Sequence, residues 1–281
     1  MENITVKDHS VSGEKFQLVF DEVLEMYKTE PQPSLDKLAS YYESEDYISH
    51  TDAKRNLFEK IYHWVRIYML SKKMSFVDMN TKSDGKKVLD IGCGTGDFLA
   101  MAQKYKWEIA GVEPDAQARK IASEKTNTEI HNNDWLSTLE DDSFDAVTMW
   151  HVLEHVPNLE EQIAELKRIV KPNGTIFIAV PNFNSHDAKH YKEFWAAYDV
   201  PRHLWHFSQK AIKVLFEKQQ MKVVKILPMK FDAYYVSLLS EKHKTGKMNP
   251  LKAFYRGFVS NFKAITSSEY SSLIYIIKNE K

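Results

Sequence analysis

Three glycines at alternate positions follow a short apolar run near the middle of the chain, where residues 88–97 read VLDIGCGTGD. Gly92, Gly94 and Gly96 let the backbone pass against a ligand where a Cβ would collide. A helix that starts directly after such a turn offers unpaired N–H groups and the positive end of its dipole. Asp90 at the strand end suits hydroxyl groups or a cation. The segment therefore predicts a loop for a nucleoside-bearing cofactor with a charge other than phosphate.

Acidic and aromatic residues also stand at the ends of later apolar runs. In an open parallel sheet, ligands bind beyond the carboxyl ends of the strands. Glu113 lies 23 positions after Asp90, where a carboxylate can hold both hydroxyls of a ribose. Asp134 and Trp135 can pair with an adenine amino group and cover the ring edge. We therefore expect a cofactor site formed by Asp90, Gly92, Gly94, Gly96, Glu113, Pro114, Asp134, Trp135 and Trp150.

The sequence disfavours two other nucleotide-binding loops. A dinucleotide fingerprint needs Gly-x-Gly-x-x-Gly, but Asp97 stands at the third glycine position. Its side chain would obstruct the close approach of helix and strand. The Lys–Ser/Thr pair of a phosphate-binding P-loop is also missing from this segment. Nicotinamide and nucleoside triphosphate cofactors are therefore not expected.

Apolar runs and amphipathic stretches alternate from residue 86 to residue 180. Helices are expected at 98–104, 116–124 and 159–170, with Asp115 as a cap and a turn at 172–174, and Ser208 caps a further helix. Repeated strand–helix units predict an α/β fold with a parallel sheet, helices on both faces and right-handed crossovers. The expected strands are 87–91, 108–112, 128–131, 144–150, 175–180, 222–227 and 273–278.

The remaining residues form regions outside this repeat. Residues 1–80 are expected to form an N-terminal helical cap, in which Thr51 begins a long helix. Residues 81–281 would form the main domain. Within it, 182–207 and 229–266 are expected to be insertions that line a substrate pocket, because long aromatic loops in compact domains are usually functional.

The stretch 250–265 predicts an amphipathic helix with Leu251, Phe254, Phe258 and Phe262 on one face. Most amphipathic helices bury such a face in their own domain. We therefore expect it to pack as a local cap. The alternatives are a pocket lid, a face for a homodimer and a helix that lies on a membrane surface.

Composition limits the class of protein. The chain has 281 residues, a formal net charge of −1 and one cysteine. The balanced charge disfavours nucleic acid and anionic membranes as partners, and one cysteine excludes an internal disulfide framework. No apolar run reaches the roughly 18–20 residues of a membrane helix, and the N-terminus has no apolar signal core. We expect a cytoplasmic protein without a membrane span.

Taken in order, the motifs resemble those of class I S-adenosylmethionine-dependent methyltransferases. The resemblance covers roughly residues 86–230 and rests on 88–97, 111–115, 133–134, 145–157 and 166–180. Residues 151–156 and 199–208 are similar to motifs of the small-molecule methyltransferases related to the ubiquinone-pathway O-methyltransferases. The resemblance implies a Rossmann-like sheet of seven strands with an antiparallel last strand. It also implies S-adenosylmethionine as cofactor and S-adenosylhomocysteine as product.

Residues 41–50 resemble a segment that follows a small zinc ribbon in a subset of this group. The ribbon's cysteine positions are occupied by non-ligands near Asp21 and Leu24. No zinc is therefore expected, and 16–28 is expected to form a hairpin. Tyr47 and His50 would close over the methionine end of the cofactor, or pack as part of an N-terminal lid.

Histidines after the fourth strand are the candidate bases. Methyl transfer from a sulfonium depends largely on proximity and alignment, whereas a hydroxyl acceptor also needs a base of near-neutral pKa. The candidates are His151, His155, His203 and His206, and we select His151 and His203 for this role. His151 with Glu154 and His155 could instead hold a divalent metal or be structural, and we expect no metal. Arg202 and His203 would line the acceptor pocket or hold their loop in place.

Together these features predict an enzyme that transfers a methyl group from S-adenosylmethionine to a small molecule, with oxygen as the acceptor atom. Two alternatives share the cofactor motifs. One is a methyltransferase of RNA or protein, and the other is a protein that binds the cofactor without catalysis.

Overall fold

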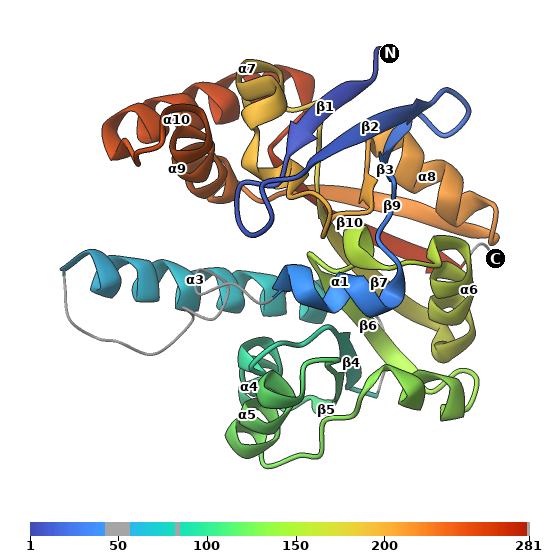
Figure 1. Ribbon diagram of the computed structural model, residues 1–281. Helices are drawn as coiled ribbons and strands as arrows, with labels where there is room; N and C mark the ends of the chain where they lie inside the picture. The colour runs from blue at the N-terminus through green and yellow to red at the C-terminus, as the bar shows by residue number, and fades with distance from the viewer. Residues whose placement is uncertain (43–56, 82–84, 280–281) are drawn as a thin grey trace.

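A six-stranded mixed sheet forms the centre of the molecule. The computed structural model describes residues 1–42, 57–81 and 85–279 (Figure 1). Within these residues the strand order of the main sheet is β5-β4-β6-β7-β10-β9. The strands are β4 (Lys87–Ile91), β5 (Glu108–Val112), β6 (Phe144–Trp150), β7 (Val170–Pro181), β9 (Met221–Pro228) and β10 (Ser272–Asn279).

The directions of the strands confirm a Rossmann-like architecture. β4 pairs in parallel with β5 and β6, and β6 pairs in parallel with β7. β10 runs antiparallel to both of its neighbours, β7 and β9, as expected for the last strand. All seven residues of β6 except Trp150 are buried, which explains why this strand reads as a continuous apolar run rather than as an alternating one.

Two local expectations about strands are wrong. Residues 128–131 do not add a strand to the main sheet. Within this stretch His131 forms a single isolated parallel bridge, to Val112. Asn127 with its left-handed φ of 49° and Asn132, whose side chain caps the next turn, leave too little extended backbone for a ladder. The expected turn at 172–174 lies within β7 as a bulge, since the pairing jumps from Val170 to Thr175.

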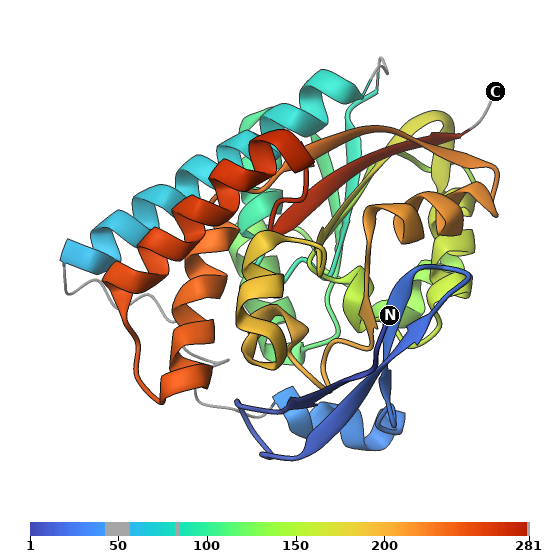
Figure 2. The same cartoon turned by 90° about the horizontal axis from the view of Figure 1, so that it is seen from above.

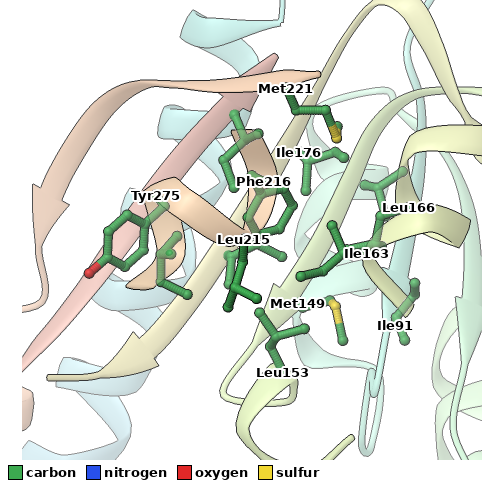
Figure 3. Close-up of a cluster of buried hydrophobic side chains, with 14 of the residues drawn as sticks. Ile91, Met149, Leu153, Ile163, Leu166, Ile176, Leu215, Phe216, Met221 and Tyr275 are labelled. Atoms are coloured by element: carbon green, nitrogen blue, oxygen red, sulfur yellow. The ribbon is translucent and has the colours of Figure 1, made fainter. Parts of the chain in front are cut away.

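Helices cover both faces of the sheet. On one face α6 (Leu159–Ile169) and α8 (Gln209–Glu217) pack on the sheet through side chains that Figure 3 shows converging. On the other face Met74 and Val77 of α3 (Leu57–Asn80) and Leu99 of α4 (Asp97–Lys104) belong to a second buried cluster. The expected caps are confirmed: Asp115 accepts from Ala118 N–H at 2.7 Å at the start of α5 (Ala116–Thr126), and Ser208 caps α8.

The first 42 residues form strands and short helical turns rather than the expected helical cap. β1 (Ile4–Lys7), β2 (Lys15–Asp21), β3 (Met26–Glu30) and β8 (Trp205–His206) make a four-stranded antiparallel sheet. The hairpin expected over 16–28 is confirmed. β8 comes from the far side of the expected boundary at residue 80, so this small sheet joins the two regions (Figure 2). The short helices here are α1 (Leu35–Leu38) and η1 (Ala39–Tyr42).

The insertions are largely helical. They contain α7 (His186–Tyr191), η4 (Lys192–Phe194), η5 (Ala196–Tyr198), α9 (Asp232–Thr245) and α10 (Pro250–Ser267). Outside the insertions, η2 (Asn133–Thr138) follows α5, and η3 (Leu153–His155) follows β6. The expected burial of one face of α10 is wrong: Leu251, Phe254, Phe258 and Phe262 are all exposed. Trp64 on α3 is also exposed, and Thr51 lies outside the described residues. Among the described helices, none is long and apolar enough to cross a membrane.

A buried arginine fastens the small sheet to the loop before β8. Arg202 is 2% exposed and donates to both carboxylate oxygens of Asp199, at 3.0 and 2.6 Å. It also donates to Asp8 at 3.2 Å and to the carbonyl oxygen of Tyr41 at 3.0 Å. Asp8 is 1% exposed, so the pair is shielded from solvent and its loss leaves a buried charge without its partner.

Arg202→Met should therefore lower the free energy of unfolding by about 3–5 kcal/mol, the usual cost of breaking a buried ion pair. Urea denaturation measures the effect. The matched control is Lys218→Met, which removes a surface pair with Glu160 at 3.0 Å and should cost less than about 1 kcal/mol. Equal losses in the two variants would contradict the anchoring role of Arg202.

Candidate functional site

The carboxyl ends of β5, β4 and β6 bring expected cofactor residues to one edge of the sheet. Asp90 of β4 lies opposite Gly111 of β5 and Thr148 of β6. Its buried carboxyl group accepts a hydrogen bond from Thr148 Oγ1 at 2.6 Å. Burial raises the pKa of Asp90 to about 7, although Thr148 and the charge of Lys73 oppose the rise. Near neutral pH this group can therefore both donate and accept a hydrogen bond.

The glycine loop folds back over the end of β5. Gly92 donates its N–H to the carbonyl oxygen of Val112 at 2.7 Å. Gly92, Gly94 and Gly96 all have positive φ. A Cβ at Gly92 would lie 2.5 Å from a methyl group of Val152, whereas a Cβ at Gly94 would have no heavy atom within 4 Å. The loop therefore leaves open space at Gly94, directly before the N-terminus of α4.

Asp97, at the third Rossmann glycine position, joins three helices. It is the first residue of α4, where a negative charge complements the helix dipole. Its carboxylate pairs with Lys125 of α5 at 2.8 Å and with Arg66 of α3. Asp97, whose side chain is incompatible with a dinucleotide fingerprint, thus connects the start of α4 to α5 and α3.

Glu113 is the carboxylate that faces this loop. Its side chain is 8% exposed, and Oε2 accepts the N–H of Gly94 at 2.8 Å while Oε1 accepts the N–H of Asp115 at 2.9 Å. Burial raises the pKa of Glu113, and the two backbone donors oppose the rise. An ionised carboxylate has about four acceptor positions, so about two remain for the hydroxyl groups of a ligand. The neighbouring Pro114 offers its carbonyl oxygen to Arg119 at 3.0 Å.

A stacked aromatic pair stands beside Glu113. The rings of Trp135 and His131 lie 4.1 Å apart at an interplanar angle of 17°, and the backbone carbonyl oxygen of His131 accepts the N–H of Glu113 at 2.9 Å. Asp134 is exposed and accepts from Asn132 at 3.3 Å. Sequence reasoning missed His131, whose only signal is its spacing of four residues from Trp135. The pair forms a flat surface on which a purine ring can stack.

Trp150 ends β6 and packs against Phe98 of α4. The Nζ atom of Lys73 on α3 lies 4.7 Å from its ring centroid, close enough for a cation–π contact. Among the described residues the buried Nε1 of Trp150 has no hydrogen-bond partner, so it can donate to a ligand. Burial lowers the pKa of Lys73, and the carboxylates of Asp232 and Asp90 oppose the change. The sequence carries no signal for Lys73, one of several basic residues along α3.

His151 follows Trp150 and lies between two carboxylates. Its Nε2 is 3.1 Å from Asp232 Oδ2 at the start of α9, and its Nδ1 is 3.3 Å from Glu154 Oε1. Its backbone has a φ of 60°, which few residues other than glycine adopt. Burial lowers the pKa of His151, but Asp232 and Glu154 outweigh burial and raise it to about 9. With both carboxylates beside it, the imidazole of His151 is therefore protonated at neutral pH. Sequence reasoning missed Asp232, which is 81 residues away.

Glu154 connects His151 to two further histidines. It is fully buried, and neither of its oxygens has a hydrogen bond among the described residues. Burial raises the pKa of Glu154, but the neighbouring charge of His151 holds it below the usual range. One ligand atom from each of Glu154, His155 and His203 lies within 4.8 Å of the others. Two imidazoles and a carboxylate suit a transition-metal ion, so the expectation that the protein uses no metal stays a prediction.

The remaining candidates belong to the loop before β8. His203 is buried and its Nδ1 lies 2.9 Å from the carbonyl oxygen of Ala197. Burial lowers the pKa of His155 to about 4, and its Nδ1 contacts Tyr42 Oη and the carbonyl oxygen of Arg202. These contacts, with those of Arg202, favour the loop-holding role over the lining of an acceptor pocket. Tyr47 and His50 lie outside the described residues.

The family of the chain follows from comparison with known proteins. The profile of the methyltransferase domain family matches residues 61–226, more than half of the chain. The chain belongs to this family. The match spans β4 to most of β9, including the glycine loop, Glu113 and His151. It confirms the expectation of a class I S-adenosylmethionine-dependent methyltransferase.

Curated relatives of this methyltransferase are named for quinone pathways. The chain is 29% identical over 120 residues to the ubiquinone biosynthesis O-methyltransferase of Thiobacillus denitrificans, a match that covers 40% of the chain and 52% of that protein. It is 34% identical over 113 residues to the demethylmenaquinone methyltransferase of Staphylococcus saprophyticus, covering 37% and 48%. The chain thus spans about half the length of the curated relatives that it matches.

Solved structures show the same fold at low sequence identity. A SAM-dependent methyltransferase from Archaeoglobus fulgidus superposes with a TM-score of 0.53 at 18% identity, covering 80% of this chain and all of that one. Geranyl diphosphate C-methyltransferase from Streptomyces coelicolor, with S-adenosylhomocysteine bound, superposes with a TM-score of 0.55 at 13% identity, covering 82% and 88%. These similarities concern the fold alone.

Proposed function

We propose that this methyltransferase transfers a methyl group from S-adenosylmethionine to a small-molecule acceptor. The observation that carries the proposal is the Glu113 carboxylate, held against the glycine loop by the N–H groups of Gly94 and Asp115 with acceptor positions left over. Glu113 would hold the ribose hydroxyls, and Trp135 with His131 would stack on the adenine. The roles of Asp90, Pro114, Asp134 and Trp150 in cofactor binding are part of the same proposal.

Oxygen is the acceptor atom that we favour. The cofactor supplies an electrophilic methyl group, and a hydroxyl acceptor must lose its proton as it attacks. Each ring nitrogen of His151 faces a carboxylate, Nε2 at 3.1 Å from Asp232 and Nδ1 at 3.3 Å from Glu154. The neutral imidazole would take the proton at a nitrogen that turns from its carboxylate to the acceptor, and the other carboxylate would stabilise the imidazolium. The name of the ubiquinone biosynthesis O-methyltransferase supports an oxygen acceptor. His203 stays a weaker candidate, because it is buried and its Nδ1 lies 2.9 Å from the carbonyl oxygen of Ala197.

Methylation of RNA or protein is a second candidate with less support. A net charge of −1 offers little attraction for nucleic acid. A protein that binds the cofactor without catalysis would share every feature of the glycine loop. Turnover on a panel of phenols and catechols distinguishes that reading from the proposed enzyme.

Glu113→Ala should weaken the affinity for S-adenosylhomocysteine about 10- to 100-fold, the usual effect of losing hydrogen bonds to a charged group. Isothermal titration calorimetry measures this affinity. Glu108→Ala is the matched control, since Glu108 is exposed at the other end of β5, and its affinity should equal that of the wild type. An unchanged affinity in Glu113→Ala would remove the ribose assignment.

The activity should increase with pH. The pKa of His151 in the folded protein is about 9. Below that pH, the fraction of His151 in the neutral form, which can accept a proton, therefore increases about tenfold per pH unit. The value of kcat/KM should therefore rise from pH 6 to about pH 9 and then level off.

His151→Asn should remove this dependence and lower kcat about 10²–10⁴-fold without changing cofactor affinity. His186→Asn, on α7, is the control and should keep both the rate and the pH profile. A rise with pH that persists in His151→Asn would assign the base elsewhere.

A further inference from the structure

Helix α10 buries its small residues and exposes its large ones. The buried residues of α10 are Ala253, Gly257, Ser260 and Ala264. A Cβ at Gly257 would lie 2.7 Å from Tyr234 Cδ1 and 2.9 Å from its Cα, so α10 approaches α9 closely along this face. The two helices lie side by side at the periphery of the molecule (Figures 1 and 2). The small residues account for the packing. On the opposite face Phe254 stacks on Tyr234 of α9 at 5.2 Å, but the large side chains of this face stay exposed in the part of the chain that the structure describes.

That opposite face is a continuous apolar stripe. Its residues are spaced at i, i+3, i+4 and i+7, within an arc of about 100° on a helix of 3.6 residues per turn. Their exposure ranges from 53% at Phe258 to 86% at Leu251. We call Leu251, Phe254, Tyr255, Phe258, Phe262 and Ile265 the α10 stripe. Contiguous exposed apolar surface of this kind marks an interaction site.

The charges around the α10 stripe are almost all positive. Residues 229–268 contain seven lysines and arginines and two acidic residues. Both acids are turned inward: Asp232 pairs with His151, and Glu241 is buried against Lys252 and Tyr191. The net charge of −1 for the whole chain hides this local excess.

Three of the basic residues are available to a partner. Lys244, Lys247 and Lys263 are exposed and form no ion pair with the part of the chain that the structure describes. Lys263 and Arg256 share one flank of the α10 stripe, since they are seven residues apart on α10.

We propose that the α10 stripe seats the protein on an anionic lipid surface. A helix with aromatic and aliphatic residues on one face and lysine or arginine along its flank lies in the headgroup region with its apolar face inserted. The 18 residues of α10 give a contact about 27 Å long. Anionic headgroups complement the exposed lysines, whereas a second copy of the chain would bring one basic face against another.

The position of the α10 stripe relates it to the candidate site. Phe258, Phe262 and Ile265 line a mostly apolar cavity of about 320 Å³ together with Phe231 and Tyr234. Phe231 directly precedes Asp232, the partner of His151. Lipid contact would therefore occur one residue away from Asp232, the partner of the candidate base. The proposal itself rests on the α10 stripe and its charges, whatever reaction the site performs.

Co-sedimentation with vesicles tests the proposal. The full chain should bind vesicles of phosphatidylcholine with phosphatidylglycerol, and binding to pure phosphatidylcholine vesicles should be at least about tenfold weaker, with loss at high salt. Phe254→Ser with Phe262→Ser should lower binding to the anionic vesicles about tenfold or more. Lys244→Gln with Lys263→Gln should lower it about 25-fold, because each basic residue near such a surface changes binding roughly fivefold.

Matched surface variants serve as controls. Val23→Ser removes an exposed apolar side chain from the β2–β3 turn, and Lys222→Gln with Lys225→Gln removes two exposed lysines from β9. Both should bind like the wild type, and circular dichroism should show all variants folded. The proposal would be overturned if the stripe variants bound anionic vesicles as well as the wild type does. It would also be overturned if the wild type did not bind these vesicles. A wild-type dimer in light scattering that Phe254→Ser with Phe262→Ser dissociates would overturn it in favour of a second copy.

Discussion

The contact between the Glu113 carboxylate and the N–H of Gly94 is the interaction on which the candidate site depends. It ties the turn after β4 to the residue after β5, at a distance of 2.8 Å. A buried carboxylate needs compensation for lost hydration, and two backbone donors supply part of it. Acceptor positions remain on this carboxylate, and a Cβ at Gly94 would have no heavy atom within 4 Å. The same contact therefore shapes the loop and leaves a polar site for hydroxyl groups.

A second buried electrostatic group lies at the end of β6. His151, Asp232 and Glu154 combine one imidazolium with two carboxylates. The pKa of His151 is raised and the pKa values of both acids are lowered, which agrees with this charge state. The arrangement links η3, which follows β6, to the start of α9. Arg202 performs the corresponding task for the small sheet, which it joins to the loop before β8. Both groups connect segments that are far apart in the sequence.

Local pattern predicts the parts of the fold that depend on local constraints. The glycine spacing predicts the loop after β4, and the apolar runs at 108–112 and 144–150 match β5 and β6 residue for residue. Asp115 and Ser208 are recognisable as caps because a cap bonds within one helical turn. The strand expected at 128–131 is absent for a local reason too. The asparagines at 127 and 132 leave too few extended residues between them to pair with a neighbouring strand.

Local patterns do not predict which residues distant in sequence come together, or which face of a helix is buried. Asp232 and Lys73 reach the candidate site from α9 and α3, and nothing in the local spacing marks them. Periodicity shows that Leu251 and Phe258 share a face of α10, but it does not show which face turns inward. Gly257 and Ala253 decide that, because they allow the closer helix contact.

The central claim is that Glu113 and the glycine loop form the site for the ribose of the methyl donor. A crystal structure with S-adenosylhomocysteine bound tests it most directly. The account predicts both ribose hydroxyls within hydrogen-bond distance of Glu113, with the adenine beside Trp135 and His131. An adenosine group bound elsewhere, with Glu113 still paired only to Gly94 and Asp115, would contradict it.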